Sequence, residues 1–562
     1  MALTTLHESS ARRGWWVGGQ INAVAVLALY LVVGVAVYAR ILPAFFVADD
    51  FAYVHDIAAS KSPAIIFSAL AGRYFRPMVV LVYYVNYQIS TLDPFSYHLT
   101  VVLLNVVNAW LVFLLGRALG APALVAPFAG LLFLVFGGHA EAVTWIGGMA
   151  DPLVTLLVLT ALLLFLKALS VERPLRFVVA IWCLFAGALL SKESAAVLPA
   201  LLVAATALVR SHKGWRHARW VLLMSLAGMA VVLAGYLLLR QSVLGFLFVN
   251  LEGLGTNTHL IATTRAFVIR SFLPQGELAL TIFMYRFDVL VGVPLAALLA
   301  WGLTKSDVRS LVFVAVCFGV ALAPVFPLSI AMVTTESERL VYMASAFASL
   351  LLVWFLGAVI QQPRVLAAIV LVLAVGNVVA LTRINQNWLE AAAIVKSAMP
   401  SFAEAVRTHG RCSSAVFFLN VPDNVRGAYI FRRGFHEALE MAAPAAMAAM
   451  AETTVLSVYG IGDANVPSRV IATGPRSMAV TLDGGWLLGA ANPPTPKVAL
   501  QDWSAQSFSA AFTPNADGSL ILYFTPRRVD FFGQVGSDDR RGCGATGELP
   551  ASGPPTASAS GT

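Results

Sequence analysis

Charged residues are scarce in this chain. Only 12% of its 562 residues are Asp, Glu, Lys or Arg, whereas 59% are hydrophobic, and the mean hydropathy is +0.80. Soluble domains carry about 25% charged residues, so this composition excludes a soluble globule with a wet surface. The chain is instead predicted to be a polytopic α-helical membrane protein.

Cysteine patterns, internal repeats and basic stripes are also lacking. Cys183 and Cys317 fall in apolar segments, and Cys412 and Cys543 are so far apart that they indicate a disulfide only weakly. No Cys/His pattern supports a zinc site. The absence of an internal repeat argues against transporters built from inverted halves. The net charge is +8, but the Lys and Arg residues form no basic stripe with aromatic residues between them. The charge therefore gives no support to nucleic-acid binding.

Long apolar segments are abundant. The first exceeds the apolar region of a signal peptide, and no convincing cleavage site follows, so it is expected to remain as a span. Arg76–Ser90 and Thr264–Phe283 are apolar but interrupted, and they are expected to lie in the membrane interface. A spanning helix needs roughly 17 to 25 residues. We predict about eleven spans, at about Trp16–Tyr38, His98–Arg117, Ala121–Phe136, Pro152–Leu169, Leu175–Leu190, Ala195–Val209, Trp220–Leu239, Phe287–Leu303, Leu311–Phe326, Leu340–Ile360 and Val365–Leu381.

The charges between these segments predict the orientation. With a cytoplasmic N-terminus, most Lys and Arg residues fall in cytoplasmic loops and most acidic residues fall outside, as the positive-inside rule requires. The chain after about Arg383 is then extracytoplasmic. We expect a multi-pass protein of a bacterial inner membrane.

Composition divides the chain into three parts. Residues 1–383 form the transmembrane domain, with a long first outer loop at 41–97, and 384–535 read as a small extracytoplasmic α+β domain, large enough to bury its own core. Residues 536–562 are rich in Gly, Ser, Ala, Pro and Thr and are expected to be disordered. The α+β domain is predicted to contain helices at Asn387–Arg407 and Gly434–Met450, kinked at Pro444, and strands at Ser414–Asn420, Val455–Tyr459, Ser477–Leu482, Ser507–Thr513 and Ser519–Phe524.

An acidic pair, Asp49-Asp50, stands about ten residues after the first span. Carboxylates near lipid are costly and are kept there mainly for function. The competing interpretation is that they cap the helix that begins at Phe51. The sequence does not distinguish the two aspartates.

Other polar residues are expected to gather at the same outer surface. Such a mixture suits transfer of a group from a lipid-linked phosphate, because a carboxylate can deprotonate an acceptor hydroxyl while cations hold the departing phosphate. These residues are Arg73, Arg76, His139, Glu141, Asp151, Lys192, Glu193, Glu338, Arg339 and Tyr342.

Together these residues resemble the GT-C glycosyltransferases, membrane enzymes that use polyprenyl- or dolichyl-phosphate sugars. The motifs are most similar to those of the TMTC-type O-mannosyltransferases and their bacterial relatives. They span Asp49 to Tyr342 and comprise Asp49-Asp50, Phe75-Arg76-Pro77-Met78, Asn86, Asp93 to Leu99 with His98, Asn105, His139 to Ile146, Leu190-Ser191-Lys192-Glu193 with Leu198-Pro199, and Glu338-Arg339 with Tyr342.

The resemblance implies an enzyme that transfers a sugar, with mannose favoured, from a polyprenyl-phosphate donor to a hydroxyl of a protein or glycan. A single displacement from a β-linked donor would invert the sugar carbon. No cofactor is implied with certainty, although an acidic loop could complete a divalent-metal site. The implied residues are Asp49 or Asp50 as base, Arg76, Lys192 and Arg339 at the donor phosphate, and His98, His139, Glu141, Glu193, Glu338 and Tyr342 in supporting roles.

Departures from the family pattern leave other interpretations open. Phe136-Gly137-Gly138 replaces a common His-Pro, Gly148-Met149 replaces a Gly-Arg pair, and 397–528 lacks tetratricopeptide repeats, so acceptor recognition cannot be transferred from the family. Lys192 and Glu193 could form a simple interfacial ion pair. The competing functions are a transporter or flippase of lipid-linked saccharides and a non-catalytic membrane scaffold.

Overall fold

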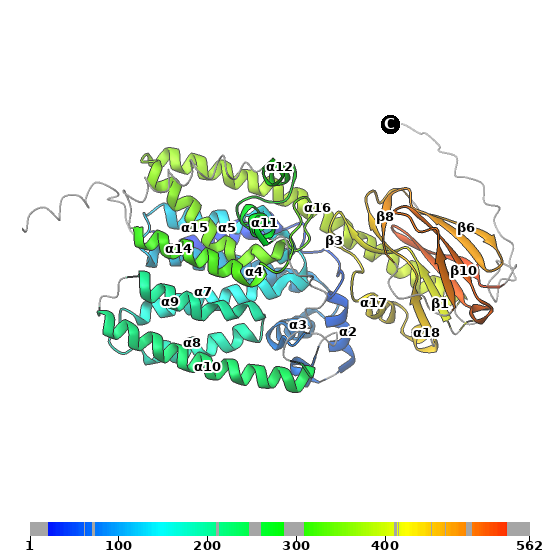
Figure 1. The fold of residues 1–562 in the computed structure, drawn as a ribbon, viewed down its shortest axis with the longest axis horizontal. Coiled ribbons are helices and arrows are strands. Elements are labelled where there is room, and N and C mark those ends of the chain that lie inside the picture. Colours follow the sequence, from blue (N-terminus) through cyan, green and yellow to red (C-terminus); the bar gives the residue numbers. More distant parts are fainter. Residues whose placement is uncertain are drawn as a thin grey trace, which may run out of the picture. The chain divides into compact units, whose positions relative to one another are not determined.

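The protein divides into two compact units in the computed structural model, which describes residues 21–60, 62–69, 74–209, 213–246, 260–285, 308–409, 413, 415–450, 452–466, 468–489 and 497–536. The first, which we call the membrane unit, comprises Met1–Ala393 and Arg426–Gly434. The second, the α/β unit, comprises Ile394–Val425 and Phe435–Thr562. Figure 1 labels helices and strands of both units.

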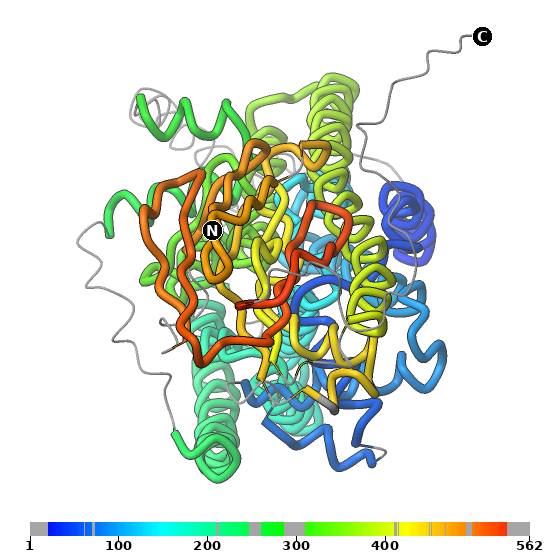
Figure 2. Tube along the Cα trace, turned by 90° about the vertical axis from the view of Figure 1, so that its right-hand side faces the viewer, coloured from blue at the N-terminus to red at the C-terminus, as the bar shows by residue number. Residues whose placement is uncertain are grey.

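The membrane unit is built from helices, as the long apolar segments predict. Figure 1 shows α7, α8 and α10 running alongside one another, and Figure 2 views them nearly end-on. The helices are α1 (Ala23–Tyr38), α2 (Asp50–Ser60), α3 (Pro77–Ser90), α4 (Phe95–Ala118), α5 (Val125–Leu134), α6 (Ala140–Val143), α7 (Ala150–Ala168), α8 (Leu175–Leu189), α9 (Leu198–Leu208), α10 (Trp215–Leu244), α11 (Leu260–Phe272), α12 (Glu277–Tyr285), α14 (Val308–Leu322), α15 (Tyr342–Val359) and α16 (Pro363–His409), with short 3-10 turns η1 (Pro63–Phe67), η2 (Gly137–His139), η3 (Ile146–Met149), η4 (Glu193–Val197), η6 (Ala323–Val325) and η7 (Glu338–Val341).

Length and apolar composition make this a polytopic helical membrane protein. Among the described residues, 5 helices are long and apolar enough to cross a membrane, or up to 6 if the bent pair of α5 with η2 and α6 is one span. Four shorter apolar helices accompany them, at Ala23–Tyr38, Leu175–Leu189, Glu193–Leu208 and Arg309–Val325. The total of about eleven stays a prediction, and the predicted span Phe287–Leu303 lies outside the described residues.

The core of the membrane unit lies where α4 packs against α5 and α7, and α15 against α5. Polar side chains in this core bond to one another: Tyr342 donates to Asn105 Oδ1 (2.8 Å), and Asn108 donates to Tyr342 Oη (3.2 Å) and to the Pro152 carbonyl (2.8 Å). A buried polar group without a partner costs about 1–3 kcal/mol, so these bonds fix α4 against α7 and α15.

The α/β unit holds helices α17 (Phe435–Ala442) and α18 (Pro444–Ala449), which break before Pro444 as predicted. A mixed sheet has the order β12-β11-β1-β4, an antiparallel sheet has the order β6-β7-β10-β9, and a third contains β2, β5 and β8. The strands are β1 (Ala415–Leu419), β2 (Val421–Val425), β4 (Glu452–Val455), β5 (Val458–Ile461), β6 (Arg469–Gly474), β7 (Ser477–Thr481), β8 (Gly485–Gly489), β9 (Val498–Gln501), β10 (Ser507–Phe512), β11 (Leu520–Thr525) and β12 (Arg528–Gln534).

Two expectations for this region need correction. The single strand predicted at Val455–Tyr459 is divided into β4 and β5, because Ser457 leaves the strand to pair its hydroxyl with Asn420. The span and the amphipathic helix predicted on either side of Arg383 form one continuous helix, α16.

Unit membership also differs from the predicted boundary at residue 383. Residues 384–393 and the segment Arg426–Gly434 group with the membrane unit. We call Arg426–Gly434, which contains β3 (Ala428–Tyr429), the return segment. The predicted disordered tail after Gly536, Cys412 and Cys543 lie outside the described residues.

Candidate active site

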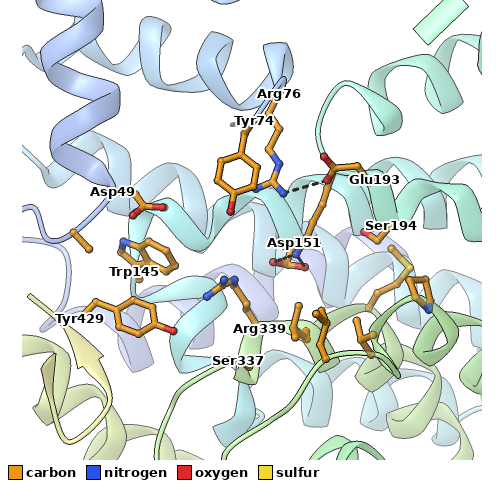
Figure 3. A pocket seen from close by; sticks show the side chains of 18 of the residues that line it. Asp49, Tyr74, Arg76, Trp145, Asp151, Glu193, Ser194, Ser337, Arg339 and Tyr429 are labelled. Atoms are coloured by element: carbon orange, nitrogen blue, oxygen red, sulfur yellow. Dashed lines mark hydrogen bonds and ion pairs between the residues drawn. The ribbon is translucent and has the colours of Figure 1, made fainter. Parts of the chain in front are cut away.

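A cavity of about 550 Å³ opens in the membrane unit. Its walls come from chain segments that are far apart in sequence and meet where several helices begin. Figure 3 shows Asp49, Arg76 and Arg339 converging on this space from different elements. The lining includes Ala48, Asp49, Tyr53, Tyr74, Arg76, Trp145, Gly147, Asp151, Lys192, Glu193, Ser194, Ser337, Arg339, Tyr429, Arg432 and Arg433, with an apolar side formed by Ala321, Pro324, Val325, Leu328, Leu340 and Met343.

The acidic pair sits on a tight turn before α2, and its two carboxylates point in different directions. Ala48 adopts φ 50°, in the left-handed region that residues with a Cβ seldom occupy. The Asp50 carboxylate is buried and accepts hydrogen bonds from the Tyr83 hydroxyl (2.7 Å) and the Val47 N–H (3.1 Å). The Asp49 side chain instead lines the cavity, and within the described part of the chain its carboxylate accepts no hydrogen bond.

This geometry separates the two aspartates chemically. Burial raises the pKa of Asp50 to about 7, although its two hydrogen bonds act in the opposite direction. Burial also raises the pKa of Asp49, against the opposing charges of Arg433, Arg339 and Arg76. The Asp50 carboxylate therefore stabilises the turn through its hydrogen bonds, whereas the Asp49 carboxylate has free lone pairs that face the cavity.

We expect Asp50→Asn to flatten the dependence of stability on pH. The pKa of Asp50 rises from 3.8 to about 7 on folding, so the folded state binds the proton more tightly. Its contribution to stability is then complete below about pH 4 and is lost as the pH rises through about 7. The lost contribution is on the order of a few kcal/mol, since one pKa unit corresponds to about 1.4 kcal/mol. Thermal unfolding of both proteins in detergent across this range measures the slope, and an equal slope in both would contradict the assignment.

Three ion pairs occupy the wall formed by the start of α7 and by η4. Lys192 Nζ lies 2.6 and 2.7 Å from the Asp151 carboxylate oxygens. Glu193 accepts from Arg76 Nη2 (3.2 Å) and from Arg240 Nη1 (2.7 Å). Burial lowers the pKa of Lys192, while the Asp151 charge acts in the opposite direction. Lys192 and Glu193 thus pair with other residues and not with each other, and both face the cavity.

A fourth ion pair lies at η7. Glu141, which is fully buried, accepts from both the backbone N–H (2.9 Å) and the guanidinium of Arg339, and also from the Tyr429 hydroxyl (2.9 Å). The Arg339 guanidinium also lies 5.2 Å from the centre of the Trp145 ring. One edge of Arg339 is therefore anchored, while its side chain lines the cavity and stays 30% exposed.

The cavity gathers six of the residues that the sequence singles out: Asp49, Arg76, Asp151, Lys192, Glu193 and Arg339. Asp50 and Glu141 lie directly behind lining residues. Four others are buried elsewhere: His98 bonds the Ala44 carbonyl, His139 bonds Ser345, Tyr342 bonds Asn105, and Glu338 pairs with Arg270. Arg73 lies outside the described residues.

Residues of the return segment were not anticipated from the sequence. Tyr429, Arg432 and Arg433 line the cavity although they follow the membrane helices by many residues. The available signal was the adjacent pair Arg432-Arg433 in a chain poor in charge, but its position assigned it to a separate domain. Trp145 lies in the motif His139 to Ile146 but was given no role, and Tyr74 was missed, because aromatic residues are common throughout the apolar segments.

Clustered metal ligands are absent from the described ranges. No group of three or more His, Cys, Asp or Glu side chains that could hold a metal ion occurs among these residues. The cavity carboxylates instead stand beside cationic side chains, as described above.

Parts of this chain are similar in sequence to known proteins. No protein-family model matches the chain. The chain is 34% identical over 156 residues to protein O-mannosyl-transferase Tmtc1 of Drosophila melanogaster, and the match covers 28% of this chain and 18% of the fly protein. It is 36% identical over 109 residues to tmtc2 of Xenopus laevis, covering 19% and 13% of the two chains. The matches thus span less than a fifth of the length of either relative.

Similar solved structures include ArnT from Cupriavidus metallidurans bound to undecaprenyl phosphate, at 14% identity and a TM-score of 0.46, covering 88% of this chain and 99% of that chain. The S. cerevisiae Pmt1–Pmt2 protein O-mannosyltransferase complex matches at 15% identity and a TM-score of 0.30, covering 45% and 37% of the two chains. The sequence comparisons confirm the resemblance to TMTC-type O-mannosyltransferases that the motifs predict, over part of the chain.

Proposed function

We propose that this protein is a GT-C type glycosyltransferase that moves a sugar from a polyprenyl-phosphate donor to a hydroxyl of a protein or glycan. The observation that carries the proposal is one cavity in which the carboxylate of Asp49 faces cations anchored on other walls. Arg76, Lys192 and Arg339 each hold a carboxylate partner, so their positions are fixed before any ligand arrives. Preorganised cations of this kind stabilise charge as it develops.

The proposed reaction is a single displacement. Asp49 accepts the proton of the acceptor hydroxyl, and the hydroxyl oxygen forms a bond to the anomeric carbon of the sugar. The bond from that carbon to the phosphate oxygen breaks, and its electron pair leaves with the polyprenyl phosphate. Arg339, Lys192 and Arg76 then hold the added negative charge, and the sugar carbon is inverted. A base with a raised pKa suits this step, because proton transfer is most effective when the pKa lies near the working pH.

The substrates and location are the finer part of the proposal. The curated relatives are named O-mannosyl-transferases, which favours mannose as the sugar and a protein as the acceptor. The charge distribution favours about eleven spans in a bacterial inner membrane, a cytoplasmic N-terminus, and a site and α/β unit on the outer side. The cavity would then meet a donor whose sugar already lies outside the cell.

Sugar transfer by purified protein in lipid nanodiscs tests this function. Radiolabelled polyprenyl-phosphate mannose is supplied with a membrane extract as acceptor, beside polyprenyl-phosphate glucose and an aminosugar donor. We expect label to move from lipid to acceptor with one of these donors. Movement of intact donor between leaflets of proteoliposomes, without transfer, would instead support the flippase. The absence of both activities would support the scaffold.

A further inference from the structure

The return segment is bonded to the turn that carries Asp49. The Ile430 carbonyl accepts a hydrogen bond from the Ala48 N–H (2.8 Å). Gly434 has φ +72°, and a Cβ placed there would lie 2.4 Å from the Ala48 carbonyl oxygen, so only glycine fits this approach. The Phe431 ring lies 6.4 Å from that of Phe51, measured between centroids. These contacts surround Ala48, the residue whose left-handed conformation turns Asp49 toward the cavity.

The same segment also reaches the opposite wall. The Tyr429 hydroxyl donates to Glu141 (2.9 Å), the carboxylate that anchors Arg339, and the Tyr429 ring packs edge-on against Trp145 at 5.2 Å. Arg433 donates to the Tyr74 hydroxyl (3.1 Å) and lines the cavity together with Asp49. One short segment therefore contacts both the turn that carries the proposed base and the support of the proposed phosphate site.

We propose that the return segment is a positioning element of the active site: it holds the turn that carries Asp49, and its Arg433 places a positive charge in the cavity that Asp49 lines. The role of Asp49 as a base rests on the proposed function. The electrostatic effect of Arg433 on Asp49 does not depend on that function. The segment lies between β2 and α17, outside the run from Asp49 to Tyr342 that carries the motifs. The region after the membrane helices would thus supply part of the site.

Electrostatics support this role. Among the cations that oppose burial and lower the pKa of Asp49, Arg433 makes the largest contribution, ahead of Arg339 and Arg76. Arg433 lines the same cavity as Asp49, and a nearby opposite charge stabilises a carboxylate, so removing Arg433 should raise the pKa of Asp49. The groups that face Asp49 are Arg433 and Arg432 from the return segment, Arg76 and Tyr74 from the chain before α3, Arg339 from η7, and Asp50 and Tyr53 from α2; Lys192, Asp151 and Glu193 also line the cavity.

The test is the pH dependence of Asp49 modification by dicyclohexylcarbodiimide, a reagent that attacks protonated carboxyls. Peptide mass mapping measures the labelling of Asp49 in the full-length protein in nanodiscs, for the wild type, Arg433→Gln and Arg433→Lys. Asp49→Asn, which has no carboxyl at this position, gives the background. The matched control is Arg426→Gln, because Arg426 belongs to the same segment but pairs with Glu390 and does not line the cavity. This readout needs no turnover.

We expect the midpoint of Asp49 labelling to rise by about one pH unit or more in Arg433→Gln. Arg433→Lys should restore it to near the wild-type value, and Arg426→Gln should leave it unchanged. An Arg433→Gln midpoint equal to that of the wild type overturns the proposal. If Arg433→Gln does not fold, Tyr74→Phe replaces it, and an unshifted midpoint there overturns the proposal in the same way.

Transfer kinetics give a second reading that separates the two proposals. The acid limb of kcat/KM should move to higher pH in Arg433→Gln by the same amount as the labelling midpoint, while kcat at high pH recovers. A purely structural loss would lower the rate at every pH. Absence of transfer in the wild type would count against the glycosyltransferase function, while the labelling experiment would still decide the role of Arg433.

Discussion

We expect Asp49→Asn to lower sugar transfer by about 10²–10⁴-fold in kcat, the range expected for loss of a general base. The amide cannot accept the acceptor's proton at neutral pH, yet it has nearly the shape of the carboxylate. Folding should be preserved, because the Asp49 carboxylate accepts no hydrogen bond within the described part of the chain. Donor binding should also persist, since the anchored cations remain. Initial rates at saturating donor, with thermal unfolding in parallel, measure both effects.

Asp50→Asn is the matched control for this result. It makes the same change of carboxyl to amide at the adjacent residue, but the Asp50 carboxylate is buried and bonded to Tyr83 and Val47. We expect a smaller loss of kcat, accompanied by a change in stability. Full turnover by Asp49→Asn, together with loss of turnover in Asp50→Asn, would transfer the role of base to Asp50.

Arg339→Gln is expected to damage both stability and donor use. The substitution leaves Glu141, which is fully buried, without its cationic partner. An uncompensated buried charge typically costs about 3–5 kcal/mol. The donor phosphate also loses a cation, so kcat/KM for the donor should fall by about 10²-fold or more. Thermal unfolding and initial rates over a donor concentration series measure the two losses separately.

The double variant Arg339→Gln, Glu141→Gln separates folding from function. It removes both charges of the pair, so most of the lost stability should return, although Tyr429 still needs its hydrogen-bond acceptor. Transfer should stay low, because the cation at the cavity is still absent. Recovery of transfer together with stability would show that Arg339 serves the fold alone.

The sequence predicts much of the site because its residues lie at the starts of helices. Asp49, Arg76, Lys192 and Arg339 stand beside long apolar segments, and their gathering at one surface follows from the way helices cross a membrane. The distinction between Asp49 and Asp50 does not follow from sequence. It depends on the left-handed turn at Ala48 and on the Tyr83 hydroxyl, which comes 33 residues later.

The return segment could not be predicted for a related reason. Tyr429 and Glu141 are 288 residues apart, and nothing local to either indicates that they meet. The change of composition after Arg383 correctly suggests a region rich in strands, but composition cannot show that part of it packs with the membrane helices. Similarly, α16 is continuous because its apolar and amphipathic parts share helical periodicity, with no breaking residue near Arg383.

The central claim is that one cavity both holds a lipid-linked phosphate and breaks its bond to the sugar. The most direct measurement follows a donor labelled separately in sugar and phosphate after single-turnover mixing with the wild type, Asp49→Asn and the Arg339→Gln, Glu141→Gln double variant. We predict sugar release by the wild type, intact donor retained by Asp49→Asn, and little donor retained by the double variant. Sugar release by Asp49→Asn at the wild-type rate, or equal retention by all three proteins, would contradict the account.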